Sequence, residues 1–253
     1  MIVGIVALLT VLFFGGPNEM FYVDDIEKGI KKNIEEKERK KEILADFKFT
    51  KSISKEYEKE RKKGFKEFKA LYNNNKTTKN QLESFFNSLQ KNRGEYQNKM
   101  IDQRILIFEK IESQEWHNII ESSITVLEKR TEKIEKKALK SKESYRKTQV
   151  KIESVIVNNT QKESILKGLE SFINTSDDLE KTLSSINASE NKILADKNSS
   201  KEDLLELISN DSAKRNAYKN SIINFHLIVK ENSSDEVFIN IMKTFFKESE
   251  INA

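Results

Sequence analysis

The sequence contains no cysteine, a single proline and only seven glycines among its 253 residues. The absence of cysteine excludes disulfide bonds, thiolate metal sites, a cysteine nucleophile and lipid attachment through an N-terminal cysteine. The one proline, Pro17, lies near the start, so no proline interrupts the rest of the chain. Because helix breakers are rare while Lys, Glu, Leu and Ile are common, the composition predicts long helices rather than a sheet.

Hydrophobic residues are also few: they make up 36% of the chain, against 34% for charged residues. Such a balance suits a thin helical bundle or coiled coil, which buries a narrow apolar seam and leaves most side chains in water. The net charge of +4 is small and by itself implies no particular partner.

An uncharged, apolar stretch from Ile2 to Gly16 opens this otherwise polar chain, and the first charge is Glu19. A membrane-spanning helix needs about 20 apolar residues and a signal-peptide core about 7–15. A buried core helix, a cleaved signal peptide and an uncleaved anchor are the three interpretations. No small-x-small cleavage site is visible, and little else in the chain could surround a buried apolar helix. We therefore predict an N-terminal membrane anchor or signal-like segment over 1–23 and a helical domain over 24–253.

The orientation of that anchor follows from the flanking charges. No Lys or Arg precedes the apolar stretch, whereas these basic residues follow it: Lys28, Lys31, Lys32, Lys37, Arg39, Lys40 and Lys41. The positive-inside rule then leaves the body on the cytoplasmic side of the membrane, although Asp24, Asp25 and Glu27 come first.

Polar turn sequences divide the body into helices over about 24–72, 78–157, 160–195, 204–229 and 237–245. Thr78 with Gln81 and Thr160 with Glu163 have the spacing of a capping box, which marks a helix start. Within the helices, apolar residues recur in steps of three and four. These seam positions include Ile26, Ile30, Phe47, Phe68, Leu127, Ile134, Tyr145, Thr148, Ile152, Leu169, Phe172, Ser176, Leu179, Leu183, Ile186, Ile193, Leu204, Tyr218, Ile222, Phe225, Val229, Val237, Ile241 and Phe245. Narrow seams joined by short turns predict an all-α fold: an elongated antiparallel helical bundle or coiled coil that follows the N-terminal membrane anchor helix.

Catalytic, cofactor and metal sites were sought by motif, and none is predicted. No phosphate-binding loop, dinucleotide fingerprint or nucleophile elbow occurs, and nearly every carboxylate has a Lys or Arg three or four residues away, as on a solvated helix face. Glu115-Trp116-His117 resembles part of a zinc motif, but no second histidine lies one turn away. We therefore interpret His117 as an ordinary histidine on a helix surface and predict that the protein is not an enzyme.

The densest local charge lies between Glu128 and Lys151, where ten basic residues stand against four acidic ones. The basic residues are Lys129, Arg130, Lys133, Lys136, Lys137, Lys140, Lys142, Arg146, Lys147 and Lys151. A smaller basic excess lies between Lys55 and Lys69. A basic helical face can bind an anionic polymer or lipid head groups, and it can also serve only to keep the helix soluble. Nucleic acid is not the expected partner, because no aromatic residues for base stacking alternate with the cations.

Two stretches carry a family resemblance: "VLEKRTEKIEKKALKSKESYRK" (Val126 to Lys147) and "SSKEDLLELI" (Ser199 to Ile208). Over about Leu82 to Ile241 the chain resembles the cell-wall-binding lipoproteins of low-GC Gram-positive bacteria, the YkyA-like family. The resemblance implies a small helical protein whose body lies outside the membrane. Lipid anchoring does not carry over, because Gly15 and Gly16 stand where the lipobox cysteine of that family would be.

These observations combine into a prediction of function. The chain is expected to be a non-catalytic, single-pass membrane protein whose helical body faces the cell envelope and contacts wall polymer, lipid head groups or another envelope protein. The alternative is a coiled-coil scaffold tethered to the cytoplasmic side of the membrane. Self-association into a homo-oligomer stays open in both cases.

Overall fold

The computed structural model describes residues 23–121, 145–209 and 212–247, and every regular element within these ranges is a helix. The all-α prediction is confirmed for this part of the chain. The helices are α3 (Val23–Asn33), α4 (Lys37–Tyr72), α5 (Lys79–Glu109), α7 (Asn159–Ala195), α8 (Lys201–Ser209), α9 (Ser212–Glu231) and α10 (Asp235–Lys247), and residues 113–121 and 145–155 are helical too. Among the described helices, none has the length and apolar character needed to cross a membrane. The predicted anchor lies outside the described residues, except for Val23.

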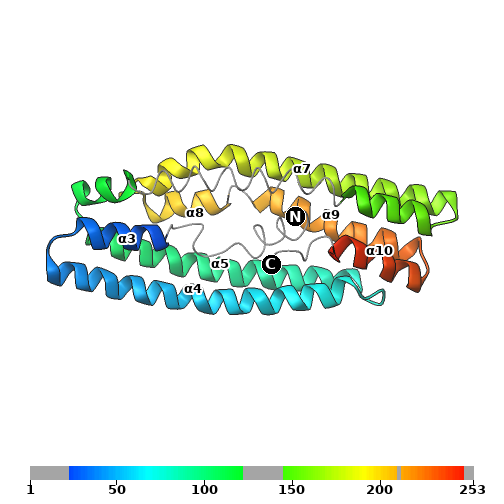
Figure 1. Cartoon of the computed structure of the whole chain (residues 1–253), viewed down its shortest axis with the longest axis horizontal. Coiled ribbons are helices and arrows are strands. Elements are labelled where there is room, and N and C mark those ends of the chain that lie inside the picture. The colour runs from blue at the N-terminus through cyan, green and yellow to red at the C-terminus, as the bar shows by residue number, and fades with distance from the viewer. Residues whose placement is uncertain (1–22, 122–144, 210–211, 248–253) are drawn as a thin grey trace.

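The helices form an elongated bundle in which long helices run side by side along the molecule (Figure 1). The α4–α5 hairpin forms one side, α7 runs along the other, and α8 and α9 lie between them. The short helices α3 and α10 fold back at opposite ends, α3 against α4 and α10 against α9. The pairs α3–α4, α4–α5, α7–α8 and α9–α10 therefore run antiparallel, as the short polar turns predict, whereas α8 and α9 follow one another along the molecule (Figure 1). Supercoiled heptad packing stays a prediction.

After the turn that follows α4, α5 begins at the capping box that the sequence predicts. The Gln81 backbone N–H donates to Thr78 Oγ1 at 3.3 Å, and the Thr78 N–H donates to Gln81 Oε1 at 2.8 Å. This reciprocal pair satisfies two of the N–H groups that a helix start leaves without partners. The capping-box prediction at Thr78 is confirmed.

The prediction of one helix over 24–72 is wrong, because the chain reverses at residues 34–36 and α3 packs back on α4. Reversal buries the apolar stripe of α3, including Ile26 and Ile30, in the same cluster as Phe47 of α4. Glu27 on α3 accepts from Lys31 and from Lys51 of α4, and these ammonium groups, Lys31 first, hold the pKa of its carboxyl below the ordinary value. Burial of the stripe therefore outweighs the helix propensity of a turn that has neither Gly nor Pro.

The predicted helix over 78–157 is also wrong, since α5 ends at Glu109 and a new helix starts at residue 113. Long-range polar contacts hold this break. Lys110 Nζ donates to Asp46 Oδ2 of α4 at 2.6 Å. Arg39 at the start of α4 donates to Glu112 at 2.8 Å and to Glu115 at 2.6 Å. These side chains join the break to residues more than 60 positions away, and Lys197 Nζ donates to the Phe108 carbonyl near the end of α5 at 3.1 Å.

One further boundary differs from expectation. Asn158, not Thr160, starts α7: its Oδ1 accepts from the Gln161 N–H at 3.1 Å, and Thr160 lies inside the helix. Because Asn is at least as good an N-cap as Thr, the helix can start directly after Asn158. The helix expected over 204–229 corresponds to α8 and α9; residues 210 and 211 between them lie outside the described residues, so its continuity stays a prediction.

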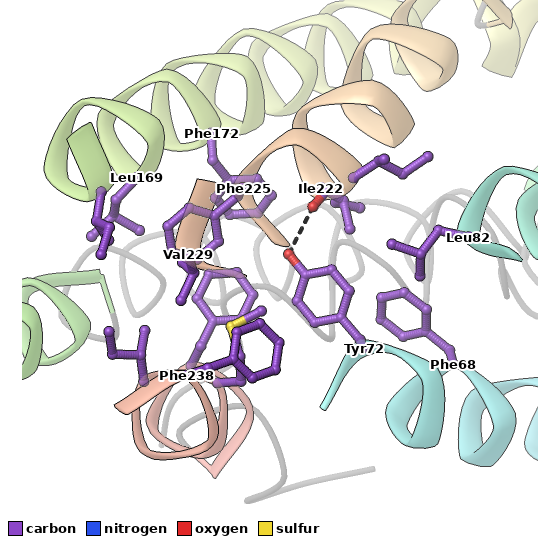
Figure 2. Close-up of a cluster of buried hydrophobic side chains, with 14 of the residues drawn as sticks. Phe68, Tyr72, Leu82, Leu169, Phe172, Ile222, Phe225, Val229 and Phe238 are labelled. Carbon is purple, nitrogen blue, oxygen red and sulfur yellow. Dashed lines mark hydrogen bonds between the residues drawn. The ribbon is translucent and has the colours of Figure 1, made fainter. Parts of the chain in front are cut away.

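The described apolar side chains form two buried clusters, one toward each end of the bundle. The larger cluster joins α4, α5, α7, α9 and α10 and is rich in aromatic rings (Figure 2). Phe172 of α7 lies at its centre, with ring centroids 5.5 Å from Tyr218, 5.4 Å from Phe245 and 5.9 Å from Tyr145. The Tyr72 hydroxyl donates to the Ile222 carbonyl at 2.8 Å (Figure 2).

The smaller cluster lies at the α3 end, where Trp116 contacts Phe108 with ring centroids 4.2 Å apart. Nearly all predicted seam positions within the described side chains are buried or partly buried in one of the two clusters, which confirms the three–four pattern. The seam positions Leu127 and Ile134, and the side chains of Leu183 and Ile186, lie outside the described set.

Candidate functional site

The described end of the basic helix, residues 145–155, has one buried and one exposed face. Tyr145, Thr148 and Ile152 are 4%, 0% and 0% exposed and pack toward α7. Arg146 and Lys147 are exposed and Lys151 is half-buried. Since buried positions recur in steps of three and four, the two cations immediately after Tyr145 point away from the core. The structure thus separates the predicted seam of this helix from the predicted cationic face.

The other seven predicted binding residues lie outside the described residues: Lys129, Arg130, Lys133, Lys136, Lys137, Lys140 and Lys142. The structure therefore brings together Arg146, Lys147 and Lys151 only, over less than two helical turns.

A tight turn fixes the C-terminal end of this helix. Ile156 is buried, and its N–H donates to the Ile152 carbonyl at 3.1 Å. Asn158 then caps α7, as described above, so the helix and the start of α7 form an antiparallel pair. Val157 at the tip is 93% exposed. The described cations are consequently carried by a helix whose end is anchored in the larger core.

A groove of about 580 Å³ lies between α4 and α5. Its floor includes Leu71, Phe85 and Leu89, and its rim carries both charged and neutral polar groups. The lining polar residues are Glu60, Lys63, Glu67, Asn80, Gln81, Ser84, Ser88 and Asn92. The arrangement offers hydrogen bonds and charges of both signs on an open surface, without a nucleophile–base pair in contact within it.

His226 of α9 is buried, although the sequence assigned it no role. Its Nδ1 lies 3.0 Å from the Tyr72 carbonyl oxygen, and because a carbonyl only accepts, Nδ1–H donates. The pKa of the imidazole is lowered to about 4, mainly by burial and in part by the nearby Lys230 ammonium, whereas the backbone hydrogen bonds with Tyr72 and Thr77 act in the opposite direction. Lys230 Nζ donates to the Thr77 carbonyl at 2.9 Å. His226 and Lys230 together attach the α4–α5 turn to α9, so their role in the described structure is to hold these elements together.

His117 is exposed on the helix 113–121, as predicted for a surface histidine. Within the described residues, no three His, Cys, Asp or Glu side chains are grouped as metal ligands would be. The adjacent Trp116 donates from Nε1 to the Ala195 carbonyl at 2.6 Å. Trp116 therefore holds the end of α7 on this side of the bundle.

Comparison of the chain with protein-family models, with curated proteins and with solved structures found no match.

Proposed function

We propose that the chain is a non-catalytic, membrane-anchored protein of the cell envelope that binds an anionic wall polymer or anionic lipid head groups through the helix from Glu128 to Lys151. The observation that carries the proposal is the two-sidedness of the described end of that helix, where Arg146 and Lys147 point outward while Tyr145 and Thr148 are in the core. The resemblance to the YkyA-like family agrees with this assignment. The anchor over 1–23 and an outward-facing body belong to the same proposal.

The chemistry of such a surface is additive. A lysine ammonium is a hydrated point charge on a flexible stem, so each contact with a phosphate or carboxylate is weak. In the helix proposed over Glu128 to Lys151, ten cations over 24 residues, about 36 Å at 1.5 Å per residue, would place many such contacts on one polymer chain. The affinity for the polymer should therefore come from the sum of these weak contacts, and it should fall steeply as the salt concentration rises.

Charge reversal along the helix tests the proposal. The variant Lys133→Glu, Lys136→Glu, Lys137→Glu and Lys140→Glu inverts the local sign and keeps Ile134 and Ala138 of the seam. Co-sedimentation of the purified full chain with teichoic-acid-bearing wall fragments, or with anionic vesicles, should drop sharply at low salt.

A matched control separates this helix from total charge. The control variant reverses four exposed lysines elsewhere: Lys76, Lys91, Lys99 and Lys243. It has the same net charge as the first variant, and it should sediment almost like the unmodified protein. Equal losses in both variants, or no loss in the first, would mean that the basic helix is only a solvated face.

A cytoplasmic scaffold is the competing outcome. In that case neither variant would alter wall binding, and the full chain would instead capture a second copy of itself or another protein at the inner side of the membrane.

A further inference from the structure

Seven lysines follow one another along α4 in steps of three and four residues. They are Lys48, Lys51, Lys55, Lys59, Lys62, Lys66 and Lys69, and we name them the α4 lysine row. At about 100° per residue, these positions fall within a sector of about 80° around the helix axis. The row therefore runs straight along one flank of α4 for about 32 Å, which is 21 residues at 1.5 Å each.

The row is open to solvent along most of its length. Lys48, Lys55, Lys59, Lys62 and Lys66 are exposed, whereas Lys51 and Lys69 at its borders are half-buried. The core side of α4, with Phe47, Ser54 and Phe68, faces away from the row. The row lies entirely within the described residues and on a helix other than the one proposed above to bind polymer.

Acidic residues of α4 are collected on the other exposed flank. By the same helical geometry, Glu56, Glu60 and Glu67 lie about 120° from the centre of the row, and Glu60 and Glu67 line the groove toward α5. One acidic residue borders the row: Glu58 accepts from Lys62 at 3.1 Å. A helix that carries charge only for solubility would favour Glu–Lys pairs at i,i+4 all around its surface. Solubility alone therefore does not explain why the lysines and the glutamates of α4 lie on separate flanks.

Four lysines of the row have no ion pair with another described residue. Within the described part of the chain, Lys48, Lys55, Lys59 and Lys66 form no ion pair, whereas Lys51 binds Glu27 of α3. Like charges at i,i+4 repel each other and cost a few tenths of a kcal/mol per pair. Repulsion that involves the four lysines without an ion pair is thus a small loss of stability that an external anion would remove.

We propose that the α4 lysine row binds a linear polyanion, a flexible chain that carries one phosphate or carboxylate group per repeat. The row is one lysine wide, and its cations are spaced by about 4.5–6 Å along the axis, so a single extended chain can follow it and contact each ammonium in turn. Lysines suit this task because point charges on mobile stems need no fixed ligand geometry. The inference does not depend on the basic helix from Glu128 to Lys151; it adds a second, separate binding face.

Two other anionic partners fit the row less well. A helix that docks on a membrane surface has apolar side chains beside its cations to enter the lipid, but the exposed Phe49 of α4 lies on the acidic flank, about 100° from Lys48. Nucleic acid would need aromatic side chains for base stacking. The aromatic residues within the row's length are placed elsewhere: Tyr57 stacks on Tyr96 with ring centroids 4.1 Å apart, Phe65 and Phe68 pack in the larger cluster, and Phe49 lies on the acidic flank.

The test uses the full chain in neutral detergent and fluorescently labelled poly(glycerol phosphate) as the probe. The variant Lys55→Gln, Lys59→Gln, Lys62→Gln and Lys66→Gln removes four charges from the row. In an anisotropy titration at about 50 mM salt, where screening is weak, its dissociation constant should rise at least about tenfold. The slope of log K against log salt should become shallower by about 0.7 for each lysine that contacts the polymer, as for other single-stranded polyanions.

The matched control is Lys76→Gln, Lys91→Gln, Lys99→Gln and Lys243→Gln, which has the same net charge and leaves the row intact. Its dissociation constant should change less than about threefold, because its lysines lie on other helices and turns and contact no common polymer chain. Equal weakening in both variants would overturn the inference, since only total charge would then matter. So would a row variant that binds the polymer normally but loses affinity for phosphatidylglycerol vesicles, which would make the row a membrane contact.

The two polymer-binding proposals fail separately. If the variant with Glu at 133, 136, 137 and 140 loses the polymer and the row variant does not, the row inference is wrong and the proposed function stands. The opposite result rejects the basic helix and supports the row. Circular dichroism on every variant checks that helix content is unchanged, as expected for exposed side chains.

Discussion

Acid should destabilise this protein through one buried side chain, His226. The pKa of a histidine in an unfolded chain is about 6.5, whereas burial lowers it to about 4 in the folded protein. Between these values the unfolded chain binds one more proton than the folded chain, so the free energy of unfolding falls as the pH falls. The stability that His226 contributes is complete above pH 6.5 and is lost progressively down to about pH 4.

The size of the effect follows from the same two pKa values. Each pKa unit corresponds to 1.36 kcal/mol, and the difference of about 2.5 units gives a loss of about 3 kcal/mol at pH 4. The ring lies between Tyr72 and Phe238, with centroids 5.0 and 5.2 Å away. The like-charged Lys230 also disfavours the imidazolium, and the backbone hydrogen bonds with Tyr72 and Thr77 offset only part of the cost of burial.

Urea unfolding of the unmodified chain and of His226→Asn, followed by circular dichroism from pH 7.5 to pH 4, measures this directly. Asparagine keeps an N–H near the position of Nδ1 but does not titrate, so the variant should be less stable at pH 7.5 and should lose about 3 kcal/mol less on acidification. Carboxylates titrate in both proteins and cancel in the difference. The exposed His117→Asn serves as the control and should follow the unmodified chain. Parallel pH curves for the unmodified chain and His226→Asn would refute the buried, neutral histidine.

Three further predictions concern the packing. Phe172→Ala should lower the free energy of unfolding by about 3–5 kcal/mol, as for other buried phenylalanines; a loss below about 1 kcal/mol in urea titrations would contradict its central place in the larger core. Gly29→Ala should cost about 1–2 kcal/mol and lower the melting temperature, because a Cβ there would lie 2.7 Å from Ile119 Cγ2; an increase in melting temperature would mean that α3 does not pack so closely. Thr78→Ala should cost about 1 kcal/mol through the lost cap, measured by urea unfolding, whereas Gln81→Glu, which keeps the reciprocal acceptor, should change stability little.

The seams could be predicted from the sequence because burial in a helix has a fixed period. Steps of three and four residues placed Ile152, Leu169 and Tyr218 on the core side, and the structure buries all three. The turn at 73–78 could be predicted for a local reason, since Thr78 and Gln81 satisfy each other's backbone groups.

The helix breaks at 34–36 and 110–112 could not be predicted in the same way. They contain no Gly or Pro, and they depend on partners far along the chain, such as Arg39 for Glu112 and Glu115. Tertiary packing decides whether the broken or the continuous helix has the lower free energy at these positions. Local helix propensity carries little information about that packing.

The candidate surfaces were partly accessible from sequence. The basic excess between Lys55 and Lys69 can be counted, but its separation from the acidic flank becomes meaningful only once Phe47 and Phe68 fix which side of α4 is buried. The burial of His226 depends on the α4–α5 turn, whose Tyr72 carbonyl lies 154 residues away in sequence. No local pattern around His226 signals that contact.

Protease accessibility of the native protein in intact spheroplasts is the measurement that tests the proposed envelope function most directly. The chain carries many lysines on exposed helix faces, so trypsin added from outside can cut it wherever the body is reachable. We expect external trypsin to degrade the region 24–253 in intact spheroplasts while a cytoplasmic marker stays whole. A body that survives until the cells are lysed, and is degraded only then, would contradict the account and favour the cytoplasmic scaffold.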